Sequence, residues 1–213
     1  MRRAGEAAAE RDDRAAAAFA AAVAELAAGR EQAAAARPEL TFEDVPPPRT
    51  LAPYAAAFAA TVELDKAEVA SGRFVLLYDP AGQPGWEGPL RVIVYIRADL
   101  EPEVAADPLL GAVGWSWLTE ALARTGGYQA ASGTVTRVVT EGFGGKAGEP
   151  PASGFELRAS WSPVAGDSQA PAAGPGLAGH VAAWCGALCA ACGLPPLTAG
   201  VTALRAPAAR NTP

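Results

Sequence analysis

The stretch that decides the fold is Leu90-Arg91-Val92-Ile93-Val94-Tyr95-Ile96-Arg97. Successive side chains of a strand point to opposite faces of a sheet. One face of this strand therefore carries only aliphatic side chains, whereas the other carries two arginines and a tyrosine around Ile93. That alternation is typical of a strand that covers a hydrophobic core with one face and meets solvent with the other.

The flanking sequence repeats one pattern, in which two strands are followed by a helix. Pro108 suits the first turn of one helix, and Gly193 followed by Pro195 ends the other. Hairpins followed by helices give an antiparallel sheet with helices on one face, so we predict an α+β fold built from two strand–strand–helix units. The predicted strands are residues 73–78, 90–97, 133–140 and 155–161, and the predicted helices are residues 107–124 and 177–192.

Alanine-rich helices are expected before this body. In residues 1–36, Phe19, Val23 and Leu26 form one narrow apolar stripe. Three prolines at residues 46–48 break the chain, and a second helix is predicted at residues 50–62. The predicted domain plan is an N-terminal helix at 1–36, one α+β domain at 37–197 with a mobile loop at 162–176, and a disordered tail at 198–213.

Composition limits the classes of function. The 213 residues include 53 alanines, 23 glycines and 19 prolines, which leaves side chains for one modest core. The net charge is −6, and Lys66 and Lys146 are the only lysines, so we expect no binding to nucleic acid. The apolar run of residues 15–24 is too short for a membrane span, and charged residues interrupt any export signal before it. We expect a cytoplasmic protein that does not bind membranes.

Three cysteines and one histidine lie close together near the C-terminus. Cys185, Cys189 and Cys192 have the spacing C-x3-C-x2-C, which is typical of a cluster-binding loop in radical enzymes. Here the segment reads as a helix, so we interpret the three cysteines as small buried residues beside its apolar stripe. His180 lies about 120–180° around that helix from them, and one helix cannot bring all four to one metal ion. We expect no bound metal and no cofactor, and we expect His180 at the surface or in the first helical turn.

A serine motif also raises the possibility of an enzyme. Residues 114–118 (GWSWL) are similar to a nucleophile elbow around Ser116, and Asp167 and His180 follow in the order found in α/β-hydrolases. However, Leu118 stands where the motif has its last glycine, and it would crowd the strained turn. A hairpin, rather than part of a parallel sheet, is predicted before it. We therefore interpret Leu118 as a core residue and Ser116 as facing away from the core.

Several longer strings resemble an actinobacterial family that is known as a domain of unknown function, numbered three thousand. They are residues 70–77 (ASGRFVLL), 79–86 (DPAGQPGW), 114–122 (GWSWLTEAL) and 131–136 (ASGTVT). The resemblance covers roughly residues 40–197 and leaves out the alanine-rich N-terminus and the tail. It implies no catalytic residue, because none is established for the family.

The polar face of the predicted sheet is the leading candidate site. Its candidate ligand-binding residues are Arg91, Tyr95, Arg97 and Arg158, with Trp86 in the preceding hairpin loop. Arginines on one face can receive a carboxylate or a phosphate. We therefore expect a non-catalytic binding or regulatory module for a partner protein or a small anionic ligand. Two alternatives stay open: a hydrolase or transferase with a site around Ser116 or His180, and a protein that binds a metal through its cysteines or is linked to haem.

Overall fold

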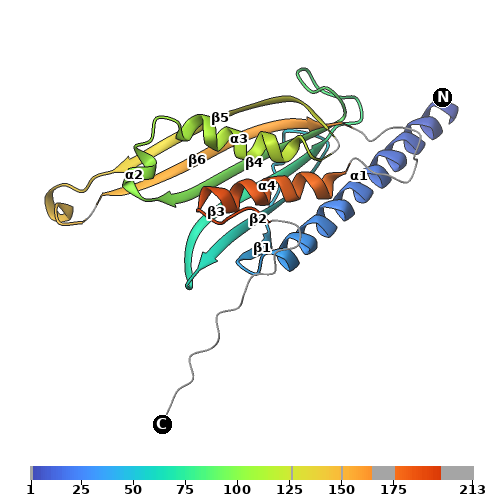
Figure 1. The fold of residues 1–213 in the computed structure, drawn as a ribbon. Helices are drawn as coiled ribbons and strands as arrows, with labels where there is room; N and C mark the ends of the chain where they lie inside the picture. The colour runs from blue at the N-terminus through green and yellow to red at the C-terminus, as the bar shows by residue number, and fades with distance from the viewer. Residues whose placement is uncertain (1, 126, 150, 165–175, 198–213) are drawn as a thin grey trace, which may run out of the picture.

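Six strands form a single antiparallel sheet in the order β1-β2-β3-β4-β6-β5 (Figure 1). The computed structural model describes residues 2–125, 127–149, 151–164 and 176–197. Every neighbouring pair of strands is antiparallel. The strands are β1 (Leu40–Asp44), β2 (Tyr54–Leu64), β3 (Ala67–Tyr78), β4 (Leu90–Leu100), β5 (Tyr128–Thr140) and β6 (Ala152–Pro163).

The helices lie together on one face of this sheet (Figure 1). The C-terminal helix α4 (Leu177–Ala191) packs between the long N-terminal helix α1 (Arg2–Ala36) and α3 (Leu110–Leu122). A single turn, α2 (Pro102–Ala105), precedes α3, and a 3-10 turn, η1 (Gly144–Lys146), lies in the β5–β6 loop. No helix within the described ranges combines the length and the hydrophobicity that crossing a membrane requires.

Helix α1 lies unusually close to α4 because both helices carry small residues where they meet. A Cβ atom added to Gly29 of α1 would stand 2.9 Å from the Cα atom of Ala178. Ala22 and Leu26 are buried in the same interface, whereas Val23 of the predicted stripe is 36% exposed. The side chain of Glu25 adds a polar contact, because its carboxylate accepts a hydrogen bond of 2.9 Å from the backbone N–H of Leu177 at the start of α4.

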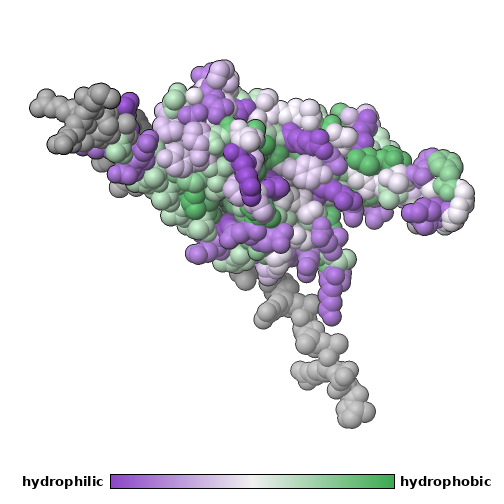
Figure 2. Space-filling model, turned by 180° about the vertical axis from the view of Figure 1, so that it is seen from behind, coloured by the Kyte–Doolittle hydropathy of each residue, from purple (hydrophilic) through white to green (hydrophobic). Residues whose placement is uncertain are grey.

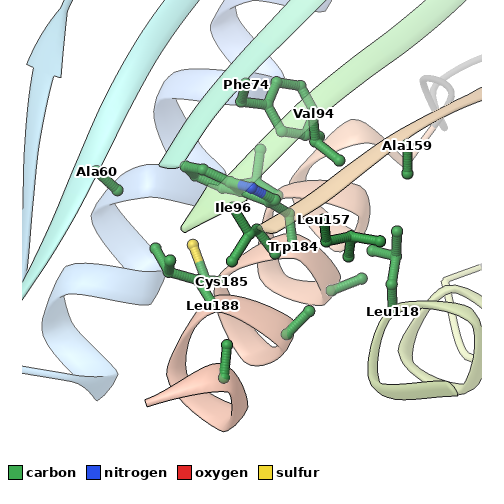
Figure 3. Packing of buried hydrophobic residues seen from close by; sticks show 14 of the residues in the cluster. Ala60, Phe74, Val94, Ile96, Leu118, Leu157, Ala159, Trp184, Cys185 and Leu188 are labelled. Carbon is green, nitrogen blue, oxygen red and sulfur yellow. The ribbon is translucent and has the colours of Figure 1, made fainter. Parts of the chain in front are cut away.

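The core between the helices and the sheet is centred on an aromatic group. Trp184 of α4 is fully buried and meets Phe58 and Phe74 in edge-to-face contacts, with ring centroids 5.6 and 5.7 Å apart. Figure 3 shows Trp184 lying flat beneath the strands, beside Phe74, Val94 and Ile96. Its ring also lies against the backbone of β3 at Gly72, where an added Cβ atom would be 2.8 Å from the ring.

The predicted α+β class is confirmed, including the antiparallel sheet, the two strand–strand–helix units and the helices on one face. The units are β3-β4-α3 and β5-β6-α4. The alternation of β4 is also confirmed, because Val92, Val94 and Ile96 are buried beneath the helices.

The predicted helix at residues 50–62 is wrong, since β2 occupies residues 54–64. Tyr54, Phe58 and Val62 are four residues apart, which suits one face of a helix. Four is also an even number, so the same residues share one face of a strand. The alanines between them would bury little surface in either a helix or a strand. Backbone pairing with β3 along the whole length of β2 makes the segment a strand. Strand β1 was not predicted.

Two segments of the predicted domain plan fall largely outside the described residues. The tail at 198–213 lies entirely outside them, as do residues 165–175 of the predicted mobile loop. Ser162 and Pro163, at the start of that loop, instead belong to β6 and are buried.

Candidate binding face of the sheet

The face of the sheet opposite the helices, which we call the open face, carries a group of arginines in two neighbouring rows. Strand pairing places Arg73 beside Tyr95 and Tyr95 beside Arg158. In the next row, Arg97 of β4 lies beside Glu156 of β6. Figure 2 shows this side of the molecule, where hydrophilic surface runs between weakly hydrophobic patches. We call Arg73, Tyr95, Arg97 and Arg158 the arginine cluster.

Each contact that holds the arginine cluster is exposed to solvent and therefore weak. The guanidinium of Arg158 lies 5.6 Å from the ring centroid of Tyr95 and donates a 3.1 Å hydrogen bond to Glu156. A looser ion pair of 3.7 Å joins Arg97 to Asp99. Exposed ion pairs of this kind contribute at most about 1 kcal/mol, so a ligand can replace them at little cost.

Arg73 belongs to the arginine cluster but was missed by the analysis of the sequence. Its guanidinium donates to the backbone carbonyl of Pro46, a neutral acceptor, and its side chain is exposed. Arg73 alternates with the apolar Phe74 in the predicted strand, so its face could be read from the sequence. The pairing of Arg73 with Tyr95 could not be read, because it depends on the register between two strands.

The arginine cluster and the carboxylates paired with it carry a net positive charge although the chain is acidic. Three guanidinium groups of the arginine cluster are balanced by two carboxylates, those of Glu156 and Asp99. Burial and the neighbouring Glu156 carboxylate raise the pKa of Tyr95 above its ordinary value. Its phenol therefore stays neutral and can donate a hydrogen bond. The arrangement suits carboxylate oxygens, which accept from guanidinium and phenol groups.

Arg91 shares the open face but is not available to a ligand. It is buried, and it donates hydrogen bonds to the carbonyl of Ala130 at 3.0 Å and the hydroxyl of Ser160 at 2.7 Å. Burial lowers its pKa below the ordinary arginine value. Ala130 lies in a bulge of β5, with a φ of 51° that alanine rarely adopts. Arg91 thus holds the bulged backbone in place, two rows away from Tyr95.

Trp86 is also separate from the arginine cluster. It is half-buried in the β3–β4 loop and, with Gln83 and Pro80, lines an open hollow of about 540 Å³ within that loop. Gln83 donates to the carbonyl of Leu51, which joins the loop to the β1–β2 connection. Of the five predicted ligand-binding residues, the structure brings together Tyr95, Arg97 and Arg158, and it places Arg91 and Trp86 elsewhere.

His180 lies in the core, so of its two predicted positions the one at the surface is wrong and the one in the first helical turn is right. It is fully buried in the first turn of α4, and its Nδ1 accepts a 3.1 Å hydrogen bond from the indole N–H of Trp161. Burial lowers the pKa of His180 to about 4. The imidazole is therefore neutral at physiological pH and carries its proton on Nε2.

The cysteines are packing residues of α4. Cys185 and Cys189 are buried and Cys192 is half-buried, as the interpretation of the helix expects. Burial raises the pKa of Cys189 to about 11 and raises the pKa values of the other two thiols as well. Among the residues with a described position, no three His, Cys, Asp or Glu side chains are arranged to hold a metal ion.

Ser116 lies within α3 rather than on a sharp turn between a strand and a helix. Its hydroxyl donates to the carbonyl of Val113, one helical turn earlier. His180 accepts from Trp161, so neither of these hydrogen bonds joins Ser116 to His180. Asp167, which follows Ser116 in the order found in α/β-hydrolases, lies outside the described residues.

A second cavity, of about 660 Å³, lies on the helix side of the molecule. It is a groove over the outer surface of α4, between the end of α1 and α3. Glycine and alanine form its floor, and Trp117, Glu120, Arg124 and Arg37 stand along its rim. The rim therefore carries both signs of charge, and the groove is separated from the arginine cluster by the whole thickness of the sheet.

Comparison with known proteins gives one match. A family model described as "Protein of unknown function (DUF3000)" matches residues 15–202. The match begins within α1, so it extends further toward the N-terminus than the resemblance of residues 40–197 implied. No curated protein and no solved structure matches the chain.

Proposed function

The chain belongs to the DUF3000 family, whose description assigns no activity, and we propose that it is a non-catalytic binding module whose open face receives an acidic segment of a partner protein. The observation that carries this proposal is the arginine cluster, a positively charged surface on a chain with a net charge of −6. We place the module in the cytoplasm, because an odd number of cysteines within one helix region does not make a disulfide framework.

The charge of the cluster favours an acidic partner. Arg73 donates to a neutral carbonyl and the other two arginines have exposed, weak ion pairs. An incoming carboxylate can therefore exchange these contacts for stronger bidentate hydrogen bonds with guanidinium groups. Complementary charge of this kind also speeds association and selects the partner.

The shape of the open face favours a protein segment over a small molecule as the ligand. Binding sites for small molecules are concave and enclose most of the ligand. Both cavities described above are lined by other residues and contain no member of the arginine cluster. A row of exposed side chains on a broad sheet fits an extended segment of a partner protein.

The enzymatic alternative has weaker support. A general base must reach the proton that it removes, whereas His180 is buried and accepts from an indole. Ser116 donates within its own helix. A haem or metal ligand role for His180 would require breaking its hydrogen bond to Trp161 and opening the core.

Fluorescence anisotropy tests the proposal with a defined probe. The probe is an end-blocked, labelled peptide of about nine residues, the length of a long strand, in which glutamate alternates with valine. We expect the peptide to bind, and we expect added salt to weaken binding because exposed charges are screened. The double variant Arg97→Ala/Arg158→Ala should weaken binding by at least about tenfold, which corresponds to about 1.4 kcal/mol.

Two controls make the result specific. The double variant Arg14→Ala/Arg124→Ala removes the same charge from exposed positions in α1 and in the turn after α3, and it should leave the affinity unchanged. A peptide with lysine in place of glutamate should not bind. Equal affinity of the Arg97→Ala/Arg158→Ala variant and the parent protein would refute the proposal.

A further inference from the structure

Strand β5 ends the sheet and, beyond the bulge at Ala130 near its start, has few of the features that usually protect an edge. It is 13 residues long and pairs with β6 along nearly its whole length. Its sequence contains no proline and no lysine, and Arg137 is its only charged residue. Most of its side chains are exposed. Long, uncharged edge strands offer a row of free backbone donors and acceptors to another chain.

The opposite edge of the sheet is protected in three ways. Strand β1 has only five residues, and two of them, Glu43 and Asp44, are acidic. Arg30 of α1 forms an ion pair with Asp44 at 2.5 Å. Three prolines follow at residues 46–48 and cannot donate to a neighbouring strand. The contrast between the two edges shows that the open edge at β5 is not a general property of this sheet.

We propose that the partner's acidic segment binds as an added strand along β5, with alternate side chains extending onto the open face. This inference rests on the proposed function and specifies how the partner is held. Backbone hydrogen bonds to β5 would supply affinity, and the side chains on the two faces would supply specificity, as in other complexes that extend a sheet.

The register of the sheet places an added strand within reach of Arg158, the member of the arginine cluster nearest to β5. Thr134 lies beside Arg158, and Thr136 lies beside Glu156, in the same rows as Tyr95 and Arg97. A residue opposite Thr134 on an added strand would lie about 10 Å from Arg158, two strand spacings away. The long side chains of arginine and glutamate can meet across the small Thr134. The cost is the contact of Arg158 with Tyr95 and its ion pair with Glu156, each worth about 1 kcal/mol or less.

The helix side of the same edge offers apolar surface around Arg137, whose guanidinium donates a hydrogen bond to the carbonyl of Asp107. Trp115 of α3 lies against β5 at Gly133, where an added Cβ atom would be 2.6 Å from its ring, and the ring is half-buried. Val135 is half-buried and Val139 is 63% exposed on the same side of β5. An added strand with alternating side chains would therefore place acids on the open face and apolar residues beside Trp115 and Val135.

Charge favours an acidic segment over a second copy of the chain as the strand that pairs with β5. Pairing β5 with the β5 of a second copy would continue the open face with the same arginines and would supply no carboxylates opposite Arg158. An acidic segment neutralises the cluster instead. Self-association through β5 is thus the main competing outcome, and the experiment separates the two.

Hydrogen–deuterium exchange of backbone amides tests where the strand is added. Saturation with the glutamate–valine peptide should slow exchange in residues 128–140, because the outward amides of β5 would gain hydrogen bonds. Exchange in β1 should not change. No change in β5, or protection confined to another element, would overturn the inference.

A pair of edge variants provides the matched control. Thr134→Glu puts a carboxylate between Arg158 and the incoming strand, so it should weaken the peptide by about tenfold or more. Thr41→Glu makes the same change on an exposed position of β1 and should have no effect. Both substitutions are on exposed strand positions, and circular dichroism checks that both variants fold.

The outcomes separate this inference from the proposed function. Binding that depends on Arg97 and Arg158 without protection of β5 would leave the proposed function standing and reject the added strand. Protection of β5 that persists in the Arg97→Ala/Arg158→Ala variant would reject the role of the arginines. A concentration-dependent dimer that Thr134→Glu dissociates would show that a second copy occupies the edge, and failure of the peptide to bind would reject both.

Discussion

His180 and Trp161 form a polar contact in the core that depends on a protonation state. The indole N–H of Trp161 donates to Nδ1 of His180, so Nδ1 must stay unprotonated. Nε2 is buried and has no hydrogen-bond partner among the described residues. A second proton would thus place a charge in an apolar environment and remove the acceptor of the indole.

This contact predicts a loss of stability at acid pH. The pKa of His180 is about 4 in the folded state, below the value of about 6.5 in an unfolded chain. The unfolded state therefore binds more protons below neutral pH, and the stability that is present above pH 6.5 declines as the pH falls toward 4. Linkage gives a loss of about 2 kcal/mol between pH 7.5 and pH 5.

Chemical denaturation at the two pH values measures this loss. His180→Gln keeps a hydrogen-bond acceptor and does not titrate, so the difference in unfolding free energy between the two pH values should be smaller in the variant by about 2 kcal/mol. An identical pH dependence in the parent and the variant would mean that His180 titrates normally in the folded state.

The hydrogen bonds and exposure of each side chain also decide which arginines are available to a ligand. Arg91 and Arg97 look equivalent in the sequence because they share one face of β4. They differ in the structure, because Arg91 donates hydrogen bonds to Ala130 and Ser160 within the protein, whereas Arg97 is exposed. The distinction depends on the bulge in β5, and no local pattern around Arg91 predicts it.

Among the elements, α1 shows how an alanine-rich helix can belong to the body of a protein. Alanine buries little surface, but it allows two helix backbones to approach closely. Gly29 is the closest point between α1 and α4, and Glu25 caps the N-terminus of α4 four residues earlier. Association of the two helices therefore depends on small size and one carboxylate rather than on a wide apolar stripe.

Enlarging Gly29 should separate the two helices. Gly29→Leu introduces a side chain where even a Cβ atom would be 2.9 Å from Ala178, and overpacking of this kind typically costs about 1–3 kcal/mol. Ala27→Leu adds the same bulk at an exposed position of α1 and should change stability by less than about 0.5 kcal/mol. Urea denaturation of both variants checks this prediction, and equal stability would contradict the close approach.

Strands and helices could be predicted where the apolar residues follow the periodicity of only one kind of element. The alternation in β4 and the apolar stripe of α4 each fit a single kind of element, and both predictions are confirmed. The apolar residues within 50–62 fit the periodicity of a helix and also that of a strand, so the sequence alone could not distinguish the two. The arginine cluster was predicted in part, because the side of a strand is a local property. Arg73 was missed since its neighbour Tyr95 is 22 positions away and the pairing depends on register.

At the scale of the whole molecule, the two faces of the sheet have different roles. One face is sealed by α1, α3 and α4 around Trp184 (Figures 1 and 3). The other face carries the arginine cluster, and it ends at the unprotected edge of β5. The charged face and the open edge adjoin one another, so one extended acidic partner can use both.

The most direct test of this account is a titration of the protein with the glutamate–valine peptide, followed by NMR of the arginine side-chain Nε–H signals. The account predicts the largest shift in the signal of Arg158, the member of the arginine cluster nearest to β5, while the signal of the buried Arg91 stays in place. Shifts confined to Arg37 and Arg124, which stand on the rim of the helix-side groove, would contradict it and move the binding site to the opposite face of the sheet.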